Sequence, residues 1–193
     1  MTMADSVARE ARMTAHLAQL GSARCAIEGD SFDVNVYDGQ PFDDTGLLLS
    51  VGLSGYVFPR VPGAEATSFE VGFVISDDLP TEFYADVVFE TGEQILEQFF
   101  DSGIRPAPGQ LLENSALTQR GIVDGHRLTS ILLGWSVWLT EGVAWNDDPV
   151  LGPLAILDMI ALTEEEADSY RRDKMAFEKK TISGEVDLLQ FRR

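Results

Sequence analysis

The chain has 193 residues, of which 45% are hydrophobic and 24% are charged, enough for one well-buried domain and too few for two. Thirty-two Asp and Glu residues against 14 Lys and Arg residues leave a net charge of −18. Nucleic acids and anionic membranes are polyanions, which this charge repels. The composition therefore argues against both as the main partner and favours a basic protein.

The charge is unevenly distributed along the chain. Residues 171–193 carry a net charge of +3, whereas the first 170 residues carry −21. Two interpretations stay open: a surface charged for solubility, or an acidic face that steers a partner by long-range attraction. In the second case, the binding surface lies outside the basic carboxyl-terminal segment.

No targeting or membrane segment is expected. Charged residues interrupt the stretch from Met1 to Leu20, which is unlike a secretory signal. The longest apolar run, Ile131 to Leu139, is the length of a strand and too short to span a membrane. Cys25 is the single cysteine and has no sequence context of a reactive thiol, so we expect a packing or surface role for it. These features predict a cytoplasmic protein.

The first part of the chain predicts one helix followed by three strands. Apolar residues recur at helical spacing from Ala4 to Leu20, and Gly21 ends the pattern. Alternating apolar and polar residues then predict strands over Ser31–Tyr37, Leu47–Leu53 and Phe69–Ile75. Because no helix separates these strands, we expect antiparallel neighbours.

The second part predicts a helix near 82–102, with Gly92 as a point where it could divide. Thr129–Leu139 is apolar on both faces and predicts a central strand, and Leu154–Leu162 predicts another strand. Thr163-Glu-Glu-Glu166 matches a capping box, which predicts a final helix from about Glu164 to about Lys180. Val186–Phe191 could add an edge strand.

Together these elements predict an α+β fold: a mixed, mainly antiparallel β-sheet flanked by helices in one domain. We expect an amino-terminal helix in residues 1–24. A sheet core follows in residues 25–162, with the inserted helix near 82–102. Residues 163–193 form the last helix and tail.

The sequence predicts no catalytic, metal or cofactor site. His16 and His126 are far apart in the chain and are interpreted as surface histidines. Gly52-Leu-Ser-Gly55 is one residue short of a nucleophile elbow and predicts a turn. The segment Asp33–Gly39 departs from a calcium loop, and no glycine-rich phosphate loop is present. We therefore expect a protein that is not an enzyme and has no cofactor.

Paired carboxylates in predicted loops are the candidate binding residues. Asp77-Asp78 and Asp147-Asp148 suit solvated turns, but they could also bind a basic surface. Trp145, with Glu141 just before it, combines a rigid aromatic with charge, as interface hot spots do. A core position for Trp145 is an equal alternative. The predicted partner-binding residues are Asp77, Asp78, Glu141, Trp145, Asp147 and Asp148.

Taken in order, several segments resemble the suppressor-of-fused domain family. The first is the early strand Phe32-Asp-Val-Asn-Val-Tyr37, and Leu49-Ser-Val-Gly-Leu-Ser54 resembles the family's strand end. Phe69-Glu-Val-Gly-Phe-Val-Ile75 resembles its next strand. Leu132-Leu133 and the block from Leu154 to Glu166, where an apolar strand runs into a helix, complete the pattern. The resemblance extends from about Ser31 to about Lys180.

This resemblance implies a non-enzymatic binding domain. The animal relative restrains a transcription factor by gripping an extended peptide, whereas small bacterial versions look like immunity proteins encoded beside polymorphic toxins. The second role suits a lone domain of this length and is consistent with its acidity, since a nuclease toxin has a basic active site. The expected partner is thus a basic toxin domain. An adaptor that captures an extended peptide by strand addition is the alternative, and the oligomeric state stays open.

Overall fold

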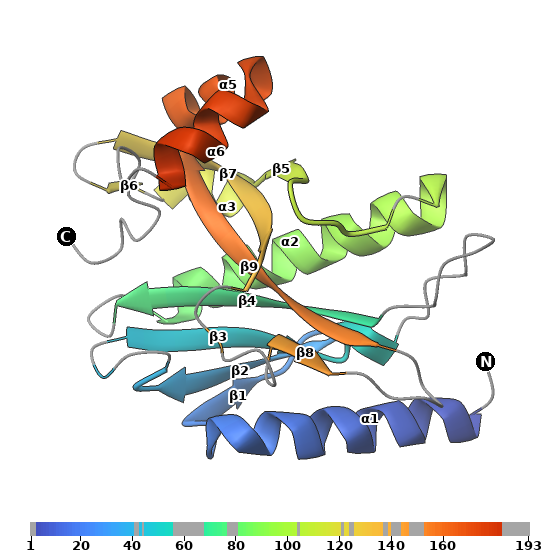
Figure 1. The fold of residues 1–193 in the computed structure, drawn as a ribbon. Coiled ribbons are helices and arrows are strands. Elements are labelled where there is room, and N and C mark those ends of the chain that lie inside the picture. The colour runs from blue at the N-terminus through green and yellow to red at the C-terminus, as the bar shows by residue number, and fades with distance from the viewer. Residues whose placement is uncertain are drawn as a thin grey trace.

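The computed structural model describes residues 3–40, 43, 45–55, 68–76, 81–103, 105–120, 122–123, 126–136, 139, 144–146 and 153–182. These residues form an α+β fold in which helices cover both faces of one mixed sheet (Figure 1). The fold class expected from the sequence is confirmed.

The sheet has the strand order β1-β2-β3-β4-β9-β7-β5. These strands are β1 (Cys25–Ile27), β2 (Asp33–Asp38), β3 (Thr45–Val51), β4 (Ser68–Ser76), β5 (Leu111–Glu113), β7 (His126–Trp135) and β9 (Leu154–Thr163). Two short strands lie off this path, since β6 (Ile122–Val123) pairs with β7 and β8 (Trp145–Asn146) pairs with β9. Among the described pairs, only β4 and β9 run parallel.

Two helical layers bury the two faces of the sheet. Helix α2 (Thr81–Ser102) covers one face, where α3 (Ser115–Arg120) packs beside it. Helix α1 (Met3–Leu17), extended by the turn η1 (Ala18–Leu20), buries part of the opposite face. Helices α5 (Glu164–Arg172) and α6 (Lys174–Ile182) bury the upper end of β7 and β9 on that same side (Figure 1).

The predicted strands are present, although β3 ends at Val51, before the predicted Leu53, and β7 ends at Trp135, before the predicted Leu139. Strands β2, β3 and β4 are consecutive antiparallel neighbours, as the missing helices between them predicted. Phe69, Val71, Phe73 and Ile75 all pack into the cluster under α2, which confirms the alternation read from the sequence. Strand β7 has neighbours on both sides and is apolar on both faces for that reason. Val186–Phe191 lies outside the described residues.

Gly92 does not divide the central helix, so that alternative was wrong. Helix α2 is continuous over 22 residues, and Gly92 lies on its buried face. A Cβ atom at this position would collide with the ring of Phe32, which enters the space that the missing side chain leaves. Gly92 is therefore a packing residue, and its low helix propensity is offset by the close contact between α2 and Phe32, the residue before β2.

The final helix is shorter than predicted. The capping box at Thr163 is present, with Glu166 N–H donating to the Thr163 hydroxyl and Thr163 N–H donating to the Glu166 carboxylate. The helix nevertheless ends at Arg172, because Asp173 adopts an extended conformation with φ −152° and ψ 90°. Asp173 then accepts from Ala176 N–H at the start of α6. The predicted single helix is thus two helices, α5 and α6.

Candidate partner-binding surface

The structure leaves the predicted binding residues untested. Asp77, Asp78, Glu141, Asp147 and Asp148 lie outside the described residues. Trp145 is placed by its backbone in β8, opposite Ala155 of β9, and its side chain is outside the description. The described residues instead form an acidic helix face and a polar groove elsewhere on the molecule.

The outer face of α2 is acidic over the whole length of the helix. Its sequence holds six carboxylates and neither Lys nor Arg. Five of them are exposed to solvent, and their spacing brings them onto one side of the helix: Glu82, Asp86, Glu93, Glu97 and Asp101. We call these five residues the acidic face of α2. Only Asp86 has an ion-pair partner among the described residues, Arg120 at 3.7 Å.

The helix dipole favours Glu82 in the first turn, but the later carboxylates of the acidic face oppose the stability of the helix. Carboxylates four residues apart repel one another, as Glu93 and Glu97 do. Asp101 lies in the last turn, which contains no basic residue, although the negative end of the helix dipole disfavours a carboxylate there. Phe100, with 66% of its surface exposed, lies beside Asp101. The carboxylates at positions 93, 97 and 101 therefore do not stabilise α2.

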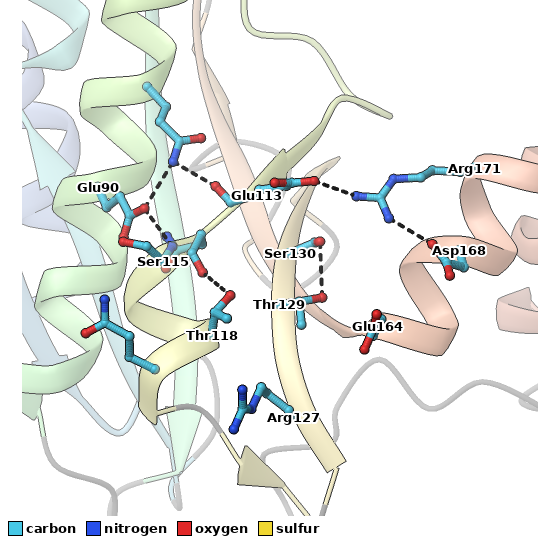
Figure 2. Close-up of a pocket in the computed structure, with 13 residues that line it drawn as sticks. Glu90, Glu113, Ser115, Thr118, Arg127, Thr129, Ser130, Glu164, Asp168 and Arg171 are labelled. Carbon is cyan, nitrogen blue, oxygen red and sulfur yellow. Dashed lines mark hydrogen bonds and ion pairs between the residues drawn. The ribbon is translucent and has the colours of Figure 1, made fainter.

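A polar groove of about 540 Å³ adjoins this helix. Strand β7 separates its two walls, with α2 and α3 on one side and α5 on the other (Figure 2). The groove is lined by residues of α2, of β5 and α3 with the residue between them, of β7 and of α5: Glu90, Gln94, Glu113, Asn114, Ser115, Thr118, Gln119, Arg127, Thr129, Ser130, Glu164, Asp168 and Arg171. The groove lies next to the acidic face of α2 through Glu90 and Gln94.

Most charges of the groove already have partners inside the protein. The Glu90 carboxylate accepts from Ser115 N–H at 2.6 Å and from Ala116 N–H at 2.8 Å, which caps the start of α3. Arg171 forms ion pairs with Glu113 at 3.3 Å and with Asp168 at 3.0 Å (Figure 2). These contacts hold β5, α3 and α5 together. The groove is therefore built largely by charges that the fold itself uses.

A buried residue in the groove wall formed by α2 and α3, Asn114, is also hydrogen bonded. Asn114 is 1% exposed, and its side chain donates to the Val87 carbonyl and the Thr91 hydroxyl of α2, each at 3.1 Å. Its Oδ1 atom accepts from Leu117 N–H at 2.9 Å, so the same residue caps α3. Asn114 thus fixes α3 against α2.

Glu70 is a charged residue that the sequence interpretation did not single out. It is fully buried on β4, and its carboxylate accepts from the Ser50 hydroxyl and, each at 3.0 Å, from Gly52 N–H and Ser54 N–H. These donors belong to the end of β3 and to the turn η2 (Leu53–Gly55). Burial raises the pKa of Glu70 to about 6, although the hydrogen bonds oppose this rise.

The position of His16 differs from the one expected from the sequence. His16 was predicted to be a surface histidine, but it is 3% exposed on the face of α1 that packs on the sheet. Its Nδ1 lies 3.3 Å from Gln19 Nε2. The helical spacing of His16 with Met13 and Leu20, both buried, was the sequence signal for this position. The side chain of His126 is outside the description.

Within the described part of the chain, no group of three or more His, Cys, Asp or Glu residues could hold a metal ion. Nor does any helix described there have an apolar stretch long enough to span a membrane. Cys25 is exposed, as one of the two expectations for it allowed.

No family model and no curated protein matches the sequence. Solved structures do match the fold. A crystal structure of a Sufu–Fu complex aligns with a TM-score of 0.62 at 14% identity, over 86% of this chain and 80% of the other. A putative suppressor-of-fused homologue from Neisseria gonorrhoeae aligns with a TM-score of 0.61 at 11% identity, over 94% and 93%.

Suppressor of fused from Drosophila also aligns, with a TM-score of 0.54 at 15% identity. That alignment covers 82% of this chain and 42% of the Drosophila chain. The resemblance found in the sequence segments therefore extends to the fold: this chain has the architecture of suppressor-of-fused domains.

Proposed function

We propose that this chain is a non-catalytic protein-binding domain, an immunity-type protein that neutralises a basic toxin partner by occluding its active site. The observation that carries the proposal is the acidic face of α2, where exposed carboxylates follow one another from Glu82 to Asp101 without a basic residue between them. Such a face is complementary to the basic surface that a nucleic-acid-binding toxin needs.

The charge distribution supports attraction at long range. Residues 1–170 carry a net charge of −21, and this excess adds to the local field of α2. A field of this kind raises the association rate more than it strengthens the final contacts. The exposed ring of Phe100 next to Asp101 supplies an apolar contact that could be buried once the partner is bound.

The fold is consistent with a binding role, because one of the similar structures is a complex of Sufu with Fu. Asp77, Asp78, Glu141, Trp145, Asp147 and Asp148 remain proposed contributors to the interface. The basic residues of the carboxyl-terminal segment are proposed to lie outside it. We also propose a cytoplasmic location, where the partner would be met.

The alternative function is an intracellular adaptor that captures an extended peptide by strand addition. It is favoured by one specific observation: β1 is an edge strand, and the structure describes no strand on its outer side. The nature of the partner separates the two functions, since an adaptor binds a disordered segment and an immunity protein binds a folded domain.

The experiment is co-expression with the product of the neighbouring gene, followed by co-purification at low and at moderate salt. We expect a complex that forms at both and associates more slowly as salt rises. The absence of a complex at both salt concentrations would contradict the immunity role.

A further inference from the structure

Two charged side chains that line the polar groove take no part in holding the fold together. Arg127 of β7 and Glu164, the first residue of α5, are both exposed, and within the described part of the chain neither side chain forms a hydrogen bond or an ion pair. Arg127 lies on the α3 side of β7 and Glu164 on the α5 side (Figure 2). The other arginine of the groove, Arg171, is bound by two carboxylates of the protein itself. Arg127 is therefore the groove cation that can receive a ligand.

An irregularity in β7 adds two hydroxyl groups to the same part of the groove. Strand β7 pairs with β9 through Leu128 and Ser130 but skips Thr129, which makes a β-bulge. Leu128 and Ile131 both pack into the cluster beneath α2 although they are three residues apart. Because side chains alternate in a regular strand, the bulge turns Thr129 and Ser130 together away from that cluster. Bulges often lie beside binding sites, where they re-aim a side chain.

The two hydroxyls leave one O–H donor for the groove. Thr129 Oγ1 and Ser130 Oγ are 3.3 Å apart (Figure 2), and neither hydroxyl has another hydrogen-bond partner among the residues that the structure describes. Ser130 is 1% exposed, so its hydroxyl cannot reach water and donates to Thr129. Thr129 is partly exposed and lines the groove. Its own O–H is therefore left to donate to an acceptor in the groove.

These unused donors define the ligand as an oxyanion. An arginine guanidinium binds carboxylates and phosphates through two parallel hydrogen bonds. Arg127 lies two residues before Thr129, about 7 Å along the strand, a distance that its long side chain spans. One anionic group can therefore accept from the Arg127 guanidinium and from the Thr129 hydroxyl.

The charges around these donors favour a carboxylate over a phosphate. Four carboxylates and two arginines line the groove, a net charge of −2, and the whole chain carries −18. This field opposes a phosphate, which carries up to two negative charges, more strongly than a carboxylate with one. It opposes a carboxylate least when cations flank that carboxylate, and Glu164 can pair with one of them. The groove therefore suits a carboxylate on a basic protein.

We propose that the polar groove binds a carboxylate of the basic partner, held by the Arg127 guanidinium and the Thr129 hydroxyl, with a flanking Lys or Arg of the partner facing Glu164. This inference rests on the proposed function, since it names one group that the basic partner presents. It makes Arg127 a determinant of specificity, because a basic surface without a carboxylate at this place would set its cations against Arg127.

The first test uses three tripeptides with blocked ends: Lys-Glu-Lys, Lys-Gln-Lys and Lys-phosphoserine-Lys. Each is titrated into the isotope-labelled full chain and followed by NMR. We expect Lys-Glu-Lys to shift the backbone amide signals of residues 127–130 and to bind about fivefold more tightly than Lys-Gln-Lys, as expected for a charge pair with an exposed arginine. Lys-phosphoserine-Lys should bind no more tightly than Lys-Glu-Lys.

Matched variants separate binding of the carboxylate from general attraction. Arg127→Gln should abolish the preference for Lys-Glu-Lys, and Thr129→Val should lower its affinity about threefold. Glu164→Gln should weaken Lys-Glu-Lys and Lys-Gln-Lys alike, by about twofold. Arg172→Gln removes an exposed cation of α5 that does not line the groove, and it should leave the preference unchanged.

Equal binding of Lys-Glu-Lys and Lys-Gln-Lys by the wild-type chain would overturn the proposal, and so would a preference that survives Arg127→Gln. Tighter binding of Lys-phosphoserine-Lys would assign the groove to a phosphate and overturn the proposal as well. Because the Arg127 side chain has no described contact to lose, Arg127→Gln should unfold at the same temperature as the wild type.

The complex with the co-expressed partner separates this inference from the proposed function. Arg127→Gln and Arg172→Gln make the same change in net charge, so both should slightly speed association with a basic partner. Only Arg127→Gln should raise the dissociation rate, by about fivefold. Equal dissociation rates would remove the groove from the interface and keep the immunity role. Carboxylate-selective binding of the peptides without any complex of the partner would keep the carboxylate site and remove that role.

Discussion

Two groups of carboxylates in this protein differ in whether they bind other parts of the fold. Glu70 inside the sheet and Glu90 beside the polar groove each accept hydrogen bonds from backbone N–H groups of a neighbouring segment. Glu93, Glu97 and Asp101 of α2 have no ion-pair partner in the described structure. Glu90 and Glu97 are seven residues apart on one helix, so local sequence does not separate them. Their contacts do, and only the second group is free to meet a partner.

Removing Glu70 should have the largest effect on folding. Glu70→Ala leaves the Ser50 hydroxyl and the N–H groups of Gly52 and Ser54 buried without their acceptor, and we expect a loss of about 3–5 kcal/mol in the free energy of unfolding. Chemical denaturation monitored by tryptophan fluorescence measures it. Should that variant fail to fold, Ser50→Ala removes one donor and should cost about 1–2 kcal/mol. A loss below 1 kcal/mol for Glu70→Ala would show that Glu70 does not hold the turn.

The pH dependence of stability should reveal the same residue. The pKa of Glu70 is raised from 4.5 to about 6 in the folded state, so its contribution is fully present below pH 4.5 and is lost as pH rises through 6. The free energy of unfolding should therefore fall by about 2 kcal/mol across this interval on account of Glu70. The measurement is the difference between wild type and Glu70→Gln at each pH, which removes the shared effect of the other carboxylates. Parallel pH profiles would contradict the raised pKa.

Glu90 should contribute less, because its partners lie nearer the surface. Glu90→Ala removes both acceptors at the start of α3 and should lower the free energy of unfolding by about 1–2 kcal/mol. Glu93→Ala, three residues along α2, is the matched control and should change stability by less than about 0.5 kcal/mol. Equal losses in the two variants would erase the distinction between used and free carboxylates.

The smallest expected effect has the opposite sign. Asp101→Lys replaces a carboxylate that the helix dipole disfavours with a cation that it favours, so the variant should be more stable by about 0.3–1 kcal/mol. Thermal unfolding at low salt measures this difference, and added salt should reduce it. A clear loss of stability would mean that Asp101 serves the fold after all.

The sequence predicted the framework better than the surface. Periodicity located α1, the three antiparallel strands and the capping box at Thr163, because each depends on neighbouring residues. Gly92 was misjudged because its role depends on Phe32, which is about sixty residues away in the chain. Strands β1 and β5, with three residues each, and the six-residue helix α3 are too short for periodicity to be visible.

The candidate surfaces were predictable only in part. The helical spacing of carboxylates from Glu82 to Asp101 was present in the sequence and would have marked the acidic face of α2. The role of Glu70 could not be found in this way, since its donors come from a different strand and a turn.

The most direct test of the central claim is the association rate with the co-expressed basic partner, measured by stopped flow at low salt for two matched double variants. Glu93→Lys with Glu97→Lys changes the acidic face of α2, and Glu165→Lys with Glu178→Lys makes the same change in net charge on α5 and α6. If α2 steers the partner, the first variant should lower the rate by about tenfold or more and the second by less than about threefold. Equal rates for the two variants would show that net charge, and not the face of α2, governs association.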